Sequence, residues 1–237
     1  MSTRLGAPRV HHRRTDSTNA RGRELAAAGA PHGTLVTAGE QSAGRGRQGR
    51  TWSAPPGRAL LMSLVLREWP RLLPLAAALA VAEVASEATT IKWPNDVLLD
   101  GRKVAGILVE GRSQEGWMVL GIGLNVALSP DDFPPELRDT AATLGRDPAE
   151  VEPALHELLG ALGVWLSVPH DDIVTAFRAR DALAGREVSW ADGSGTAEGI
   201  DGNGRLLVRA GEEVRALDAG EVHLGVGGQG QTPRADA

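Results

Sequence analysis

The chain has 237 residues, 42% of them hydrophobic, and a formal net charge of −5 at pH 7. This length and apolar content predict a soluble globular protein with one large domain, or one large and one small domain. The absence of cysteine excludes disulfides, thiolate catalysis and cysteine-bound metals, and the acidic balance argues against a nucleic-acid-coating surface.

The larger predicted domain spans residues 15–182, after an expected disordered arm at residues 1–14. A helix capped by Asp16 or Ser17 is predicted to run to about Gly29. Leucines at spacings of three and four predict two further helices, at residues 72–82 and 155–166. Apolar runs predict buried strands at residues 33–38, 59–66, 104–110 and 117–126.

The sequence pattern changes near residue 184, where short apolar segments alternate with the turn sequences ADGSG and DGNG. This pattern predicts a small C-terminal β-barrel over residues 183–225. The glycine-rich tail, residues 226–237, has too little apolar surface to offset its ordering entropy and is expected to be disordered. No apolar run reaches the roughly 20 residues that span a bilayer, and no secretory signal is evident at the start, so we expect a cytoplasmic protein that binds no membrane.

Lysine is the most informative residue type, because only two of the 25 basic residues are lysines, Lys92 and Lys103. A compact ammonium group suits some sites that a planar guanidinium does not fit. The two lysines therefore nominate a functional site, although chance under a compositional bias is the alternative. Asparagine is also rare, and three of its four copies, Asn19, Asn95 and Asn125, lie in the short motifs DSTN, WPND and GIGLN.

The segment GRGRQGR, residues 44–50, has three arginines and three glycines in a net acidic chain. Its glycines let the backbone approach a ligand, and its guanidinium groups offer forked donors to carboxylate or phosphate oxygens. The spacing also matches the G-x-G-x-x-G dinucleotide fingerprint, but that fingerprint needs a helix to begin there, and Pro55-Pro56 follows instead. We therefore predict an anion-binding loop that closes over a ligand, with a solvated charged loop as the alternative.

The two lysines lie in a predicted hairpin over residues 92–109. Pro94 favours an extended Trp93, so that Lys92 faces opposite to Trp93 and both lysines border one pocket. Core packing is the favoured interpretation of Trp93. Asp96 is either a turn-stabilising carboxylate or part of the cleft, and Glu110 is either a surface charge or a metal ligand.

Taken in order, DSTN, Gln41 with AGRGRQGR, KWPND, GRKVAGILVE and GIGLNV resemble the biotin protein ligases over about residues 15–225. The resemblance implies an α/β (α+β) fold: a catalytic domain like that of class II aminoacyl-tRNA synthetases, with a mixed sheet and flanking helices, and a small C-terminal SH3-like β-barrel. It implies that ATP and biotin form biotinyl-5′-AMP, with Mg²⁺ held mainly by the ATP phosphates. The biotinyl group then passes to a lysine of a biotin carboxyl carrier protein. Only about 14 residues precede DSTN, so the chain resembles the ligases without an N-terminal DNA-binding domain.

The resemblance also implies functional residues. Catalytic roles fall on Arg45, Arg47, Lys103, Asp96 and Lys92. Contacts to biotin or its adenylate fall on Ser17, Thr18, Asn19, Gln41, Gly44, Arg45, Gly46, Arg47, Trp52, Lys103, Gly106 and Asn125. For Trp52, packing within its own loop is the alternative to covering the adenylate.

Three other functions compete with this one. A lipoate or octanoate ligase has related architecture and acyl-transfer chemistry. A biotin-sensing DNA-binding repressor is disfavoured by the acidic charge, and we expect no nucleic-acid partner. The third is a binding module that acts through its C-terminal barrel. The sequence leaves a homodimer open.

Overall fold

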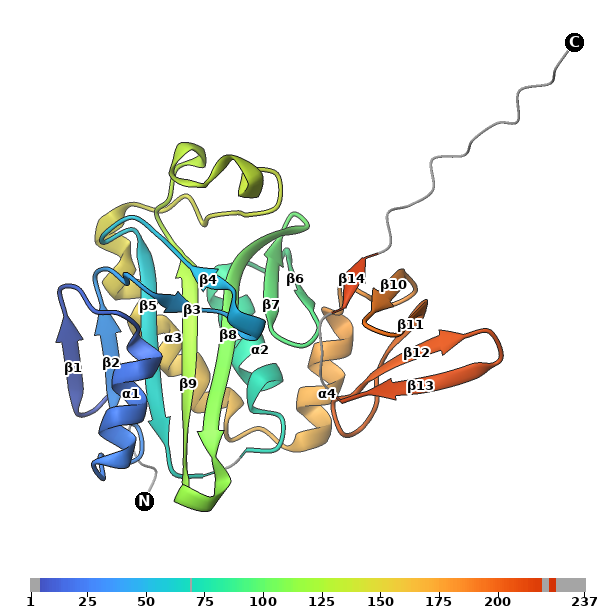
Figure 1. Ribbon diagram of the computed structural model, residues 1–237, viewed down its shortest axis with the longest axis horizontal. Coiled ribbons are helices and arrows are strands. Elements are labelled where there is room, and N and C mark those ends of the chain that lie inside the picture. The colour runs from blue at the N-terminus through green and yellow to red at the C-terminus, as the bar shows by residue number, and fades with distance from the viewer. Residues whose placement is uncertain (1–4, 69, 219–221, 225–237) are drawn as a thin grey trace, which may run out of the picture. The chain divides into compact units, whose positions relative to one another are not determined.

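A computed structural model describes residues 5–68, 70–218 and 222–224, and the chain divides into two compact units between Ala182 and Leu183. The first unit contains a seven-stranded mixed sheet covered by helices on both faces (Figure 1). In sheet order, its strands are β1 (Arg9–His12), β2 (Leu35–Ala38), β5 (Ala59–Leu66), β9 (Trp117–Asn125), β8 (Arg102–Arg112), β7 (Asp96–Leu99) and β6 (Thr89–Lys92). Only β1 and β2 pair in parallel, and every other neighbouring pair is antiparallel.

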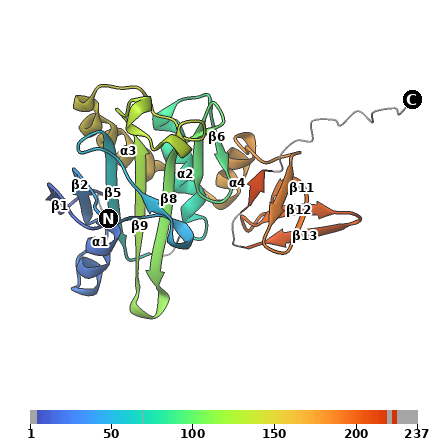
Figure 2. The same ribbon diagram turned by 45° about the horizontal axis from the view of Figure 1, so that its top comes forward.

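Among the described residues, four helices flank this sheet, namely α1 (Thr18–Ala27), α2 (Leu73–Ala85), α3 (Val151–Trp165) and α4 (His170–Ala179). Figure 1 shows α1 in front of the sheet and α2 and α3 behind it. The helix α2 is apolar nearly all round because it packs between the sheet and the helices α3 and α4. The front face is left to α1 and to a small hairpin of β3 (Gly44–Arg45) and β4 (Thr51–Trp52), as Figure 2 also shows. Within the described residues, no helix is long and apolar enough to cross a membrane.

Strand β5 is the centre of the core, since all eight of its residues are buried. Its bounds equal those of the predicted apolar run at residues 59–66. Strand β8 covers the predicted strand at 104–110, and β9 covers all but the last residue of the predicted strand at 117–126. Burial on both faces removes the alternation of polar and apolar residues, which is why a continuous apolar run marks this strand.

Two expectations need correction. Residues 1–14 were expected to be disordered, but Arg9–His12 forms β1, an edge strand paired with β2. A half-exposed edge strand needs no apolar run, so its polar sequence RVHH gave no strand signal. The single hairpin over residues 92–109 is instead the three-stranded meander β6–β7–β8. Its second turn has Asp100 and Gly101 at positive φ (50° and 73°), the geometry that an Asp-Gly hairpin turn requires.

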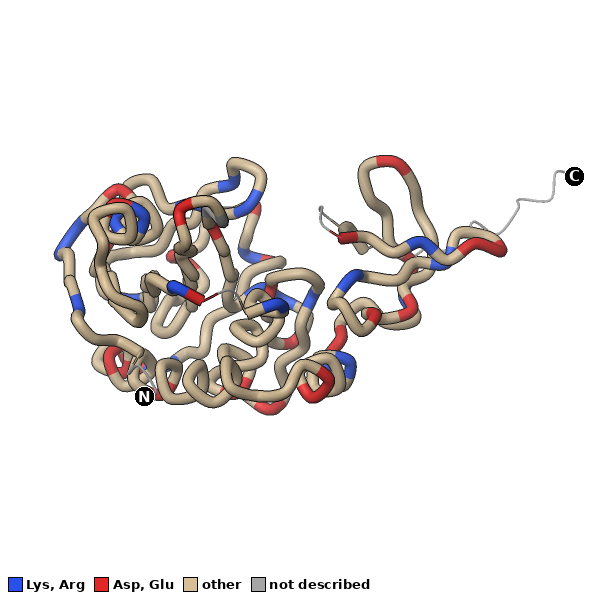
Figure 3. Tube along the Cα trace, turned by 90° about the horizontal axis from the view of Figure 1, so that it is seen from below, with Lys and Arg blue, Asp and Glu red and all other residues tan. Residues whose placement is uncertain are grey.

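The second unit contains a five-stranded antiparallel sheet. In sheet order, its strands are β13 (Glu213–Leu217), β12 (Leu206–Ala210), β11 (Gly193–Ile200), β10 (Glu187–Trp190) and β14 (His223–Leu224). The DGNG segment is the predicted turn, in which the Asp201 carboxylate accepts hydrogen bonds from the backbone N–H groups of Asn203 and Arg205, both at 2.9 Å. Figure 3 shows acidic and basic positions interspersed in each unit. The predicted disordered tail, residues 226–237, lies outside the described residues.

Candidate active site

The glycine- and arginine-rich segment forms the β3–β4 hairpin, whose tip is a 3-10 turn at residues 47–49. A Cβ at Gly44 would collide with the Trp52 carbonyl oxygen, and Gly49 has φ 76°, so both positions require glycine. A cavity of about 530 Å³ lies against this hairpin. Its lining comprises residues 43–51 together with Leu108 and Glu110 of β8. The volume falls within the range of small-molecule sites.

The arginines of this hairpin contact two different groups. Arg47 donates from Nη1 to Asn95 Oδ1 at 3.1 Å, and partial burial lowers the pKa of its guanidinium while Asp96 opposes that shift. Arg45 lies more exposed, with Nη1 3.9 Å from Glu110 Oε1. Asn95 in turn donates to the Ile107 carbonyl oxygen at 2.8 Å, so the WPND turn holds Arg47 toward β8.

Glycines on β8 and β9 form a flat floor beneath the hairpin. Gly106 and Gly123 are register partners in adjacent strands, and a Cβ at Gly123 would collide with the Trp52 indole. Lys103 Nζ lies 5.7 Å from the centroid of the Trp52 ring, within cation–π range. The indole Nε1 is buried without a hydrogen-bond partner among the described residues. Trp52 therefore lies on the floor of the site with an unused donor.

The first residues of α1 supply hydroxyl groups to the same face. Thr18 donates from its backbone N–H to Gln41 Oε1 at 2.7 Å, and its Oγ1 lies 3.0 Å from the same oxygen. These bonds fix the orientation of the Gln41 amide. Ser17 is the N-cap residue and is 2% exposed, yet no hydrogen bond of its hydroxyl is found among the described residues. Its oxygen is not among the described polar atoms that are fully buried without a partner, so this hydroxyl is accessible to a ligand.

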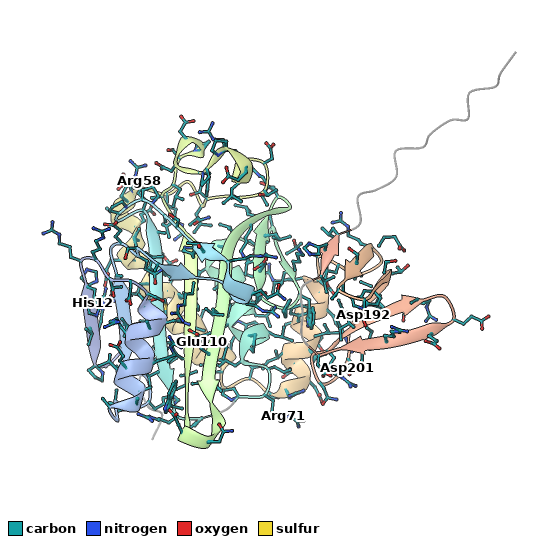
Figure 4. The ribbon with its side chains drawn as sticks, viewed as in Figure 1. His12, Arg58, Arg71, Glu110, Asp192 and Asp201 are labelled. Carbon is teal, nitrogen blue, oxygen red and sulfur yellow. The ribbon has the colours of Figure 1, made fainter. Side chains whose placement is uncertain are left out.

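Asn19 extends this polar group across the sheet. Its Nδ2 donates to Glu110 Oε2 at 2.8 Å and to the Leu108 carbonyl oxygen at 3.4 Å, while its Oδ1 lies 2.6 Å from Ser63 Oγ. Gly121 lies beneath it, where a Cβ would collide with Oδ1. Figure 4 labels Glu110, and the partners of this carboxylate come from α1 and the hairpin.

The two lysines meet at Asp96. Lys103 Nζ lies 2.7 Å from Asp96 Oδ1, and Lys92 is the register partner of Asp96 across β6 and β7. Burial lowers the pKa of the Lys92 ammonium, Asp96 raises it, and Arg50 and Lys103 lower it further. Both lysines thus lie beside Asp96, but the lining of the 530 Å³ cavity includes neither lysine, so their shared pocket stays a prediction. Trp93 is 2% exposed, in agreement with the predicted core packing.

The structure gathers most of the residues that the sequence predicted for the site. These residues come from the start of α1 with its N-cap, from the segment between β2 and β3, from the β3–β4 hairpin and from the meander. They are Ser17, Thr18, Asn19, Gln41, Gly44, Arg45, Gly46, Arg47, Trp52, Lys92, Asp96, Lys103 and Gly106. Asn125 is different, because its Nδ2 donates to the Ala142 carbonyl oxygen at 2.9 Å and so fastens residues 142–144 to β9.

One residue of the site escaped the sequence prediction. Ser63 is fully buried between Thr18 and Asn19, and its signal is a lone hydroxyl in the apolar run ALLMSLVL. Asn95 was nominated with the WPND motif but was given no chemical role, and it accepts a hydrogen bond from Arg47. Glu110, for which a metal-ligand role was open, is occupied by nitrogen donors from Asn19, Arg23 and Arg45. Among the described residues no group of three acidic or histidine side chains could hold a metal ion.

Comparisons with known proteins agree on one family. The model of the biotin/lipoate A/B protein ligase family matches residues 12–126, and that of the biotin protein ligase C-terminal domain matches residues 185–225. The chain is 35% identical to a bifunctional ligase/repressor of Bacillus subtilis over 93% of its own length and 75% of that protein. It is 36% identical to a biotin–[acetyl-CoA-carboxylase] ligase of Paracoccus denitrificans, covering 90% of this chain and 98% of the relative.

A solved structure of a biotin protein ligase from Aquifex aeolicus, in complex with biotin and ATP, is similar to this fold with a TM-score of 0.78. The two sequences are 29% identical, and the match covers 92% of this chain and 98% of the other.

Proposed function

The chain belongs to the biotin protein ligase family, and we infer that it is an ATP-dependent ligase that activates biotin as biotinyl-5′-AMP and transfers the biotinyl group to protein. The observation that carries the assignment of residues is the convergence of two unlike groups on one face of the sheet. Hydroxyl and amide groups at the start of α1 lie at one side, and arginines and lysines lie at the other. The first group suits a neutral polar ring, and the second suits a carboxylate meeting a phosphate.

We assign the first half-reaction to the cations. A carboxylate oxygen of biotin attacks the α-phosphorus of ATP, the new O–P bond forms, and the bond to pyrophosphate breaks. Two unit anions 4 Å apart repel by about 4 kcal/mol at an effective dielectric constant of 20. Arg45, Arg47 and Lys103 offset that repulsion and align the attacking and leaving groups.

Biotin recognition falls to the opposite side of the site. The ring of biotin is a urea with two N–H donors and one carbonyl acceptor, and Ser17, Thr18 and Gln41 offer matching groups in a largely buried setting. Asn19 acts differently from the predicted contact, because its amide hydrogens already bind Glu110 and the Leu108 carbonyl oxygen. Its role is to hold the start of α1 against the sheet.

Asp96 and Lys103 link the two half-reactions. The Lys103 ammonium and the Asp96 carboxylate pair with each other at 2.7 Å. Phosphate and acyl oxygens of the intermediate attract Lys103, and Asp96 then becomes available to the incoming lysine of the carrier. The acceptor amine gains Asp96 as a partner only after the adenylate has formed.

In the second half-reaction the carrier amine attacks the acyl carbon, an N–C bond forms, and the C–O bond to AMP breaks. Asp96 is a poor base toward free ammonium, because ordinary pKa values near 3.9 and 10.4 make that transfer uphill by about 9 kcal/mol. Asp96 instead orients the amine and accepts its proton as the N–C bond forms and the nitrogen becomes acidic.

Mg²⁺ fits this site only as a companion of ATP. Both carboxylates of the described site, Asp96 and Glu110, are bonded to nitrogen donors, so the protein offers little to a bare cation. We assign Mg²⁺ to the phosphate oxygens of ATP, whose negative charge it partly neutralises when bound.

The test follows both half-reactions with the purified chain. Biotin-dependent exchange of pyrophosphate into ATP measures adenylate formation, and biotin incorporation into a biotin carboxyl carrier domain measures transfer. A carrier domain with its acceptor lysine replaced by arginine is the control. Lipoate and octanoate are run in parallel, and the assignment is wrong if either of them, rather than biotin, is activated and transferred.

A further inference from the structure

Ser63 is a polar residue in an apolar strand. It lies in the middle of β5, is 0% exposed, and every other residue of that strand is apolar. A buried hydroxyl costs free energy unless it is hydrogen-bonded. Its Oγ lies 2.9 Å from Thr18 Oγ1 and 2.6 Å from Asn19 Oδ1, so both of its neighbours belong to the start of α1.

The hydrogens of this group can be counted. Three oxygen–oxygen contacts connect Gln41 Oε1, Thr18 Oγ1, Ser63 Oγ and Asn19 Oδ1 in a row, at 3.0, 2.9 and 2.6 Å. The amide oxygens at the two ends carry no hydrogen, and each hydroxyl carries one. Two hydrogens therefore serve three contacts, and one contact lacks a hydrogen.

The direction of the Ser63 hydrogen follows from the Asn19 amide. Asn19 Nδ2 donates to the Glu110 carboxylate, which leaves Oδ1 facing Ser63 as an acceptor. The contact to Oδ1 is the shortest of the three, so Ser63 donates its hydrogen there. Gly121 lacks the side chain that would push this amide away. Ser63 then keeps a lone pair for the Thr18 hydroxyl hydrogen, whose other acceptor is Gln41 Oε1 at 3.0 Å.

This arrangement changes what Thr18 offers to a ligand. When the Thr18 hydroxyl donates inward to Ser63, lone pairs of Thr18 Oγ1 and Gln41 Oε1 are both left for an outside donor. Without Ser63 the Thr18 hydroxyl can donate only to Gln41 Oε1, and its hydrogen then lies between the two acceptor oxygens. A ligand with N–H groups can donate to both oxygens only when the Thr18 hydrogen points to Ser63.

We propose that Ser63 is a positioning residue for biotin: by accepting the Thr18 hydroxyl hydrogen, it turns Thr18 Oγ1 toward the ligand as an acceptor for a ring N–H of biotin. The proposal rests on the proposed function and names a residue of that same site. Ser63 is fully buried, and its hydrogen bonds go to Thr18 and Asn19 at the start of α1. We therefore expect its effect on the binding of biotin and not on the binding of ATP.

The test compares Ser63→Ala with the wild type in pyrophosphate exchange. We expect the KM for biotin to rise about five- to tenfold, the effect of one neutral hydrogen bond, with kcat and the KM for ATP within about twofold of wild type. Ser63→Cys keeps the size of the side chain and weakens the acceptor, so its KM for biotin should lie between the two.

The matched control is Thr89→Val. Thr89 is 2% exposed, and its hydroxyl donates to the carbonyl oxygens of Ala82 at 3.1 Å and Ser86 at 2.7 Å, in the turn between α2 and β6. This variant loses a buried hydroxyl outside the site, so its melting temperature should fall while its KM for biotin stays unchanged.

A folded Ser63→Ala with the wild-type KM for biotin overturns the proposal, as does an equal rise in Thr89→Val. If Ser63→Ala does not fold, a wild-type KM for biotin in Ser63→Cys overturns it. Failure of the proposed function is a separate result, because the wild-type chain itself would then form no biotinyl-AMP.

Discussion

The two sides of the site differ in how their polar groups are held. The hydroxyl side, defined as Ser17, Thr18, Gln41 and Ser63, is largely buried and is bonded through neutral groups. The cationic side, defined as Arg45, Arg47, Lys92, Lys103 and Asp96, is partly exposed, with side-chain exposures of 34% for Lys103 and 51% for Arg45. One side is fixed before a ligand arrives, and the other holds partners that a ligand can replace.

This difference follows from the physics of the two kinds of contact. Buried neutral hydrogen bonds are costly to leave unmade, so they determine one geometry. Partly exposed ion pairs contribute little to stability, so the same side chains exchange partners at low cost. Recognition of a rigid ring suits the first arrangement. A reaction in which charge appears and moves suits the second.

The largest expected effect is the loss of a cation from the cationic side. Lys103→Ala removes the ammonium that we assign to the reacting oxygens, and pyrophosphate exchange should slow by about 10²- to 10³-fold, as when one preorganised donor is lost. Arg102→Ala is the control, because Arg102 is an exposed cation adjacent to Lys103 on β8. Equal losses in the two variants would show that general charge, and not the position of Lys103, matters.

The next effect separates the two half-reactions. Asp96→Asn should slow transfer to the carrier by about a hundredfold, while pyrophosphate exchange stays at the wild-type rate or rises because Lys103 has lost its competing carboxylate. The measurement is single-turnover transfer from preformed biotinyl-AMP. Asp100→Asn is the control, because it removes a carboxylate near the opposite end of β7. Asparagine tolerates the positive φ of 50° at this position. A similar decrease in both half-reactions would contradict the role assigned to Asp96.

A smaller effect is expected at the tip of the hairpin. Arg47→Gly removes the contact to Asn95 and adds backbone freedom, so the hairpin should retain biotinyl-AMP about tenfold less well. Released adenylate would acylate lysines of a bystander protein such as albumin, and blotting with streptavidin measures that product. Arg14→Gly, at a 66% exposed arginine outside the cavity lining, is the control. If Arg47→Gly retains biotinyl-AMP as tightly as the wild type, the hairpin does not hold the adenylate in the site.

The sequence predicted those features that leave a local pattern. Burial on both faces marks β5 as an apolar run, and glycine with arginine marks the hairpin at residues 44–50. Features that depend on distant partners left no such pattern. Strand β1 is polar because it is an edge, and its partner β2 is more than twenty residues away.

The same limit applies to single side chains. Asn19 and Asn125 are two of only four asparagines, and both were predicted to contact a ligand. The Asn19 amide nonetheless donates to Glu110 and to the Leu108 carbonyl oxygen, and the Asn125 amide donates to the Ala142 carbonyl oxygen. Which hydrogen bonds an amide makes depends on residues 17 to 91 positions away, and no local motif encodes them.

The smallest effect is expected at an ion pair outside both sides of the site. It tests whether biotin binding and catalysis are independent of the overall stability of the fold. Arg9 of β1 donates from both Nη atoms to the Glu152 carboxylate on α3, including an Nη2–Oε2 bond of 2.9 Å. The hydrogen bond from Arg9 lowers the pKa of Glu152 below its ordinary 4.5. A carboxyl whose pKa is lower in the folded state stabilises the fold above the unfolded pKa and loses that contribution as the pH falls through the folded pKa.

Glu152→Gln should therefore lower the free energy of unfolding at pH 7 by less than about 1 kcal/mol, because this ion pair is half exposed. The difference from wild type should shrink below pH 4.5 and vanish in stronger acid, as measured by urea unfolding across that range. Glu157→Gln is the control, because Glu157 lies on the same helix as Glu152 and pairs with Arg146, which precedes that helix. Both half-reactions should keep their wild-type rates. A changed KM for biotin in Glu152→Gln would mean that the ion pair between β1 and α3 affects the geometry of the hydroxyl side. The hydrogen bonds of that side would then not be sufficient to fix it.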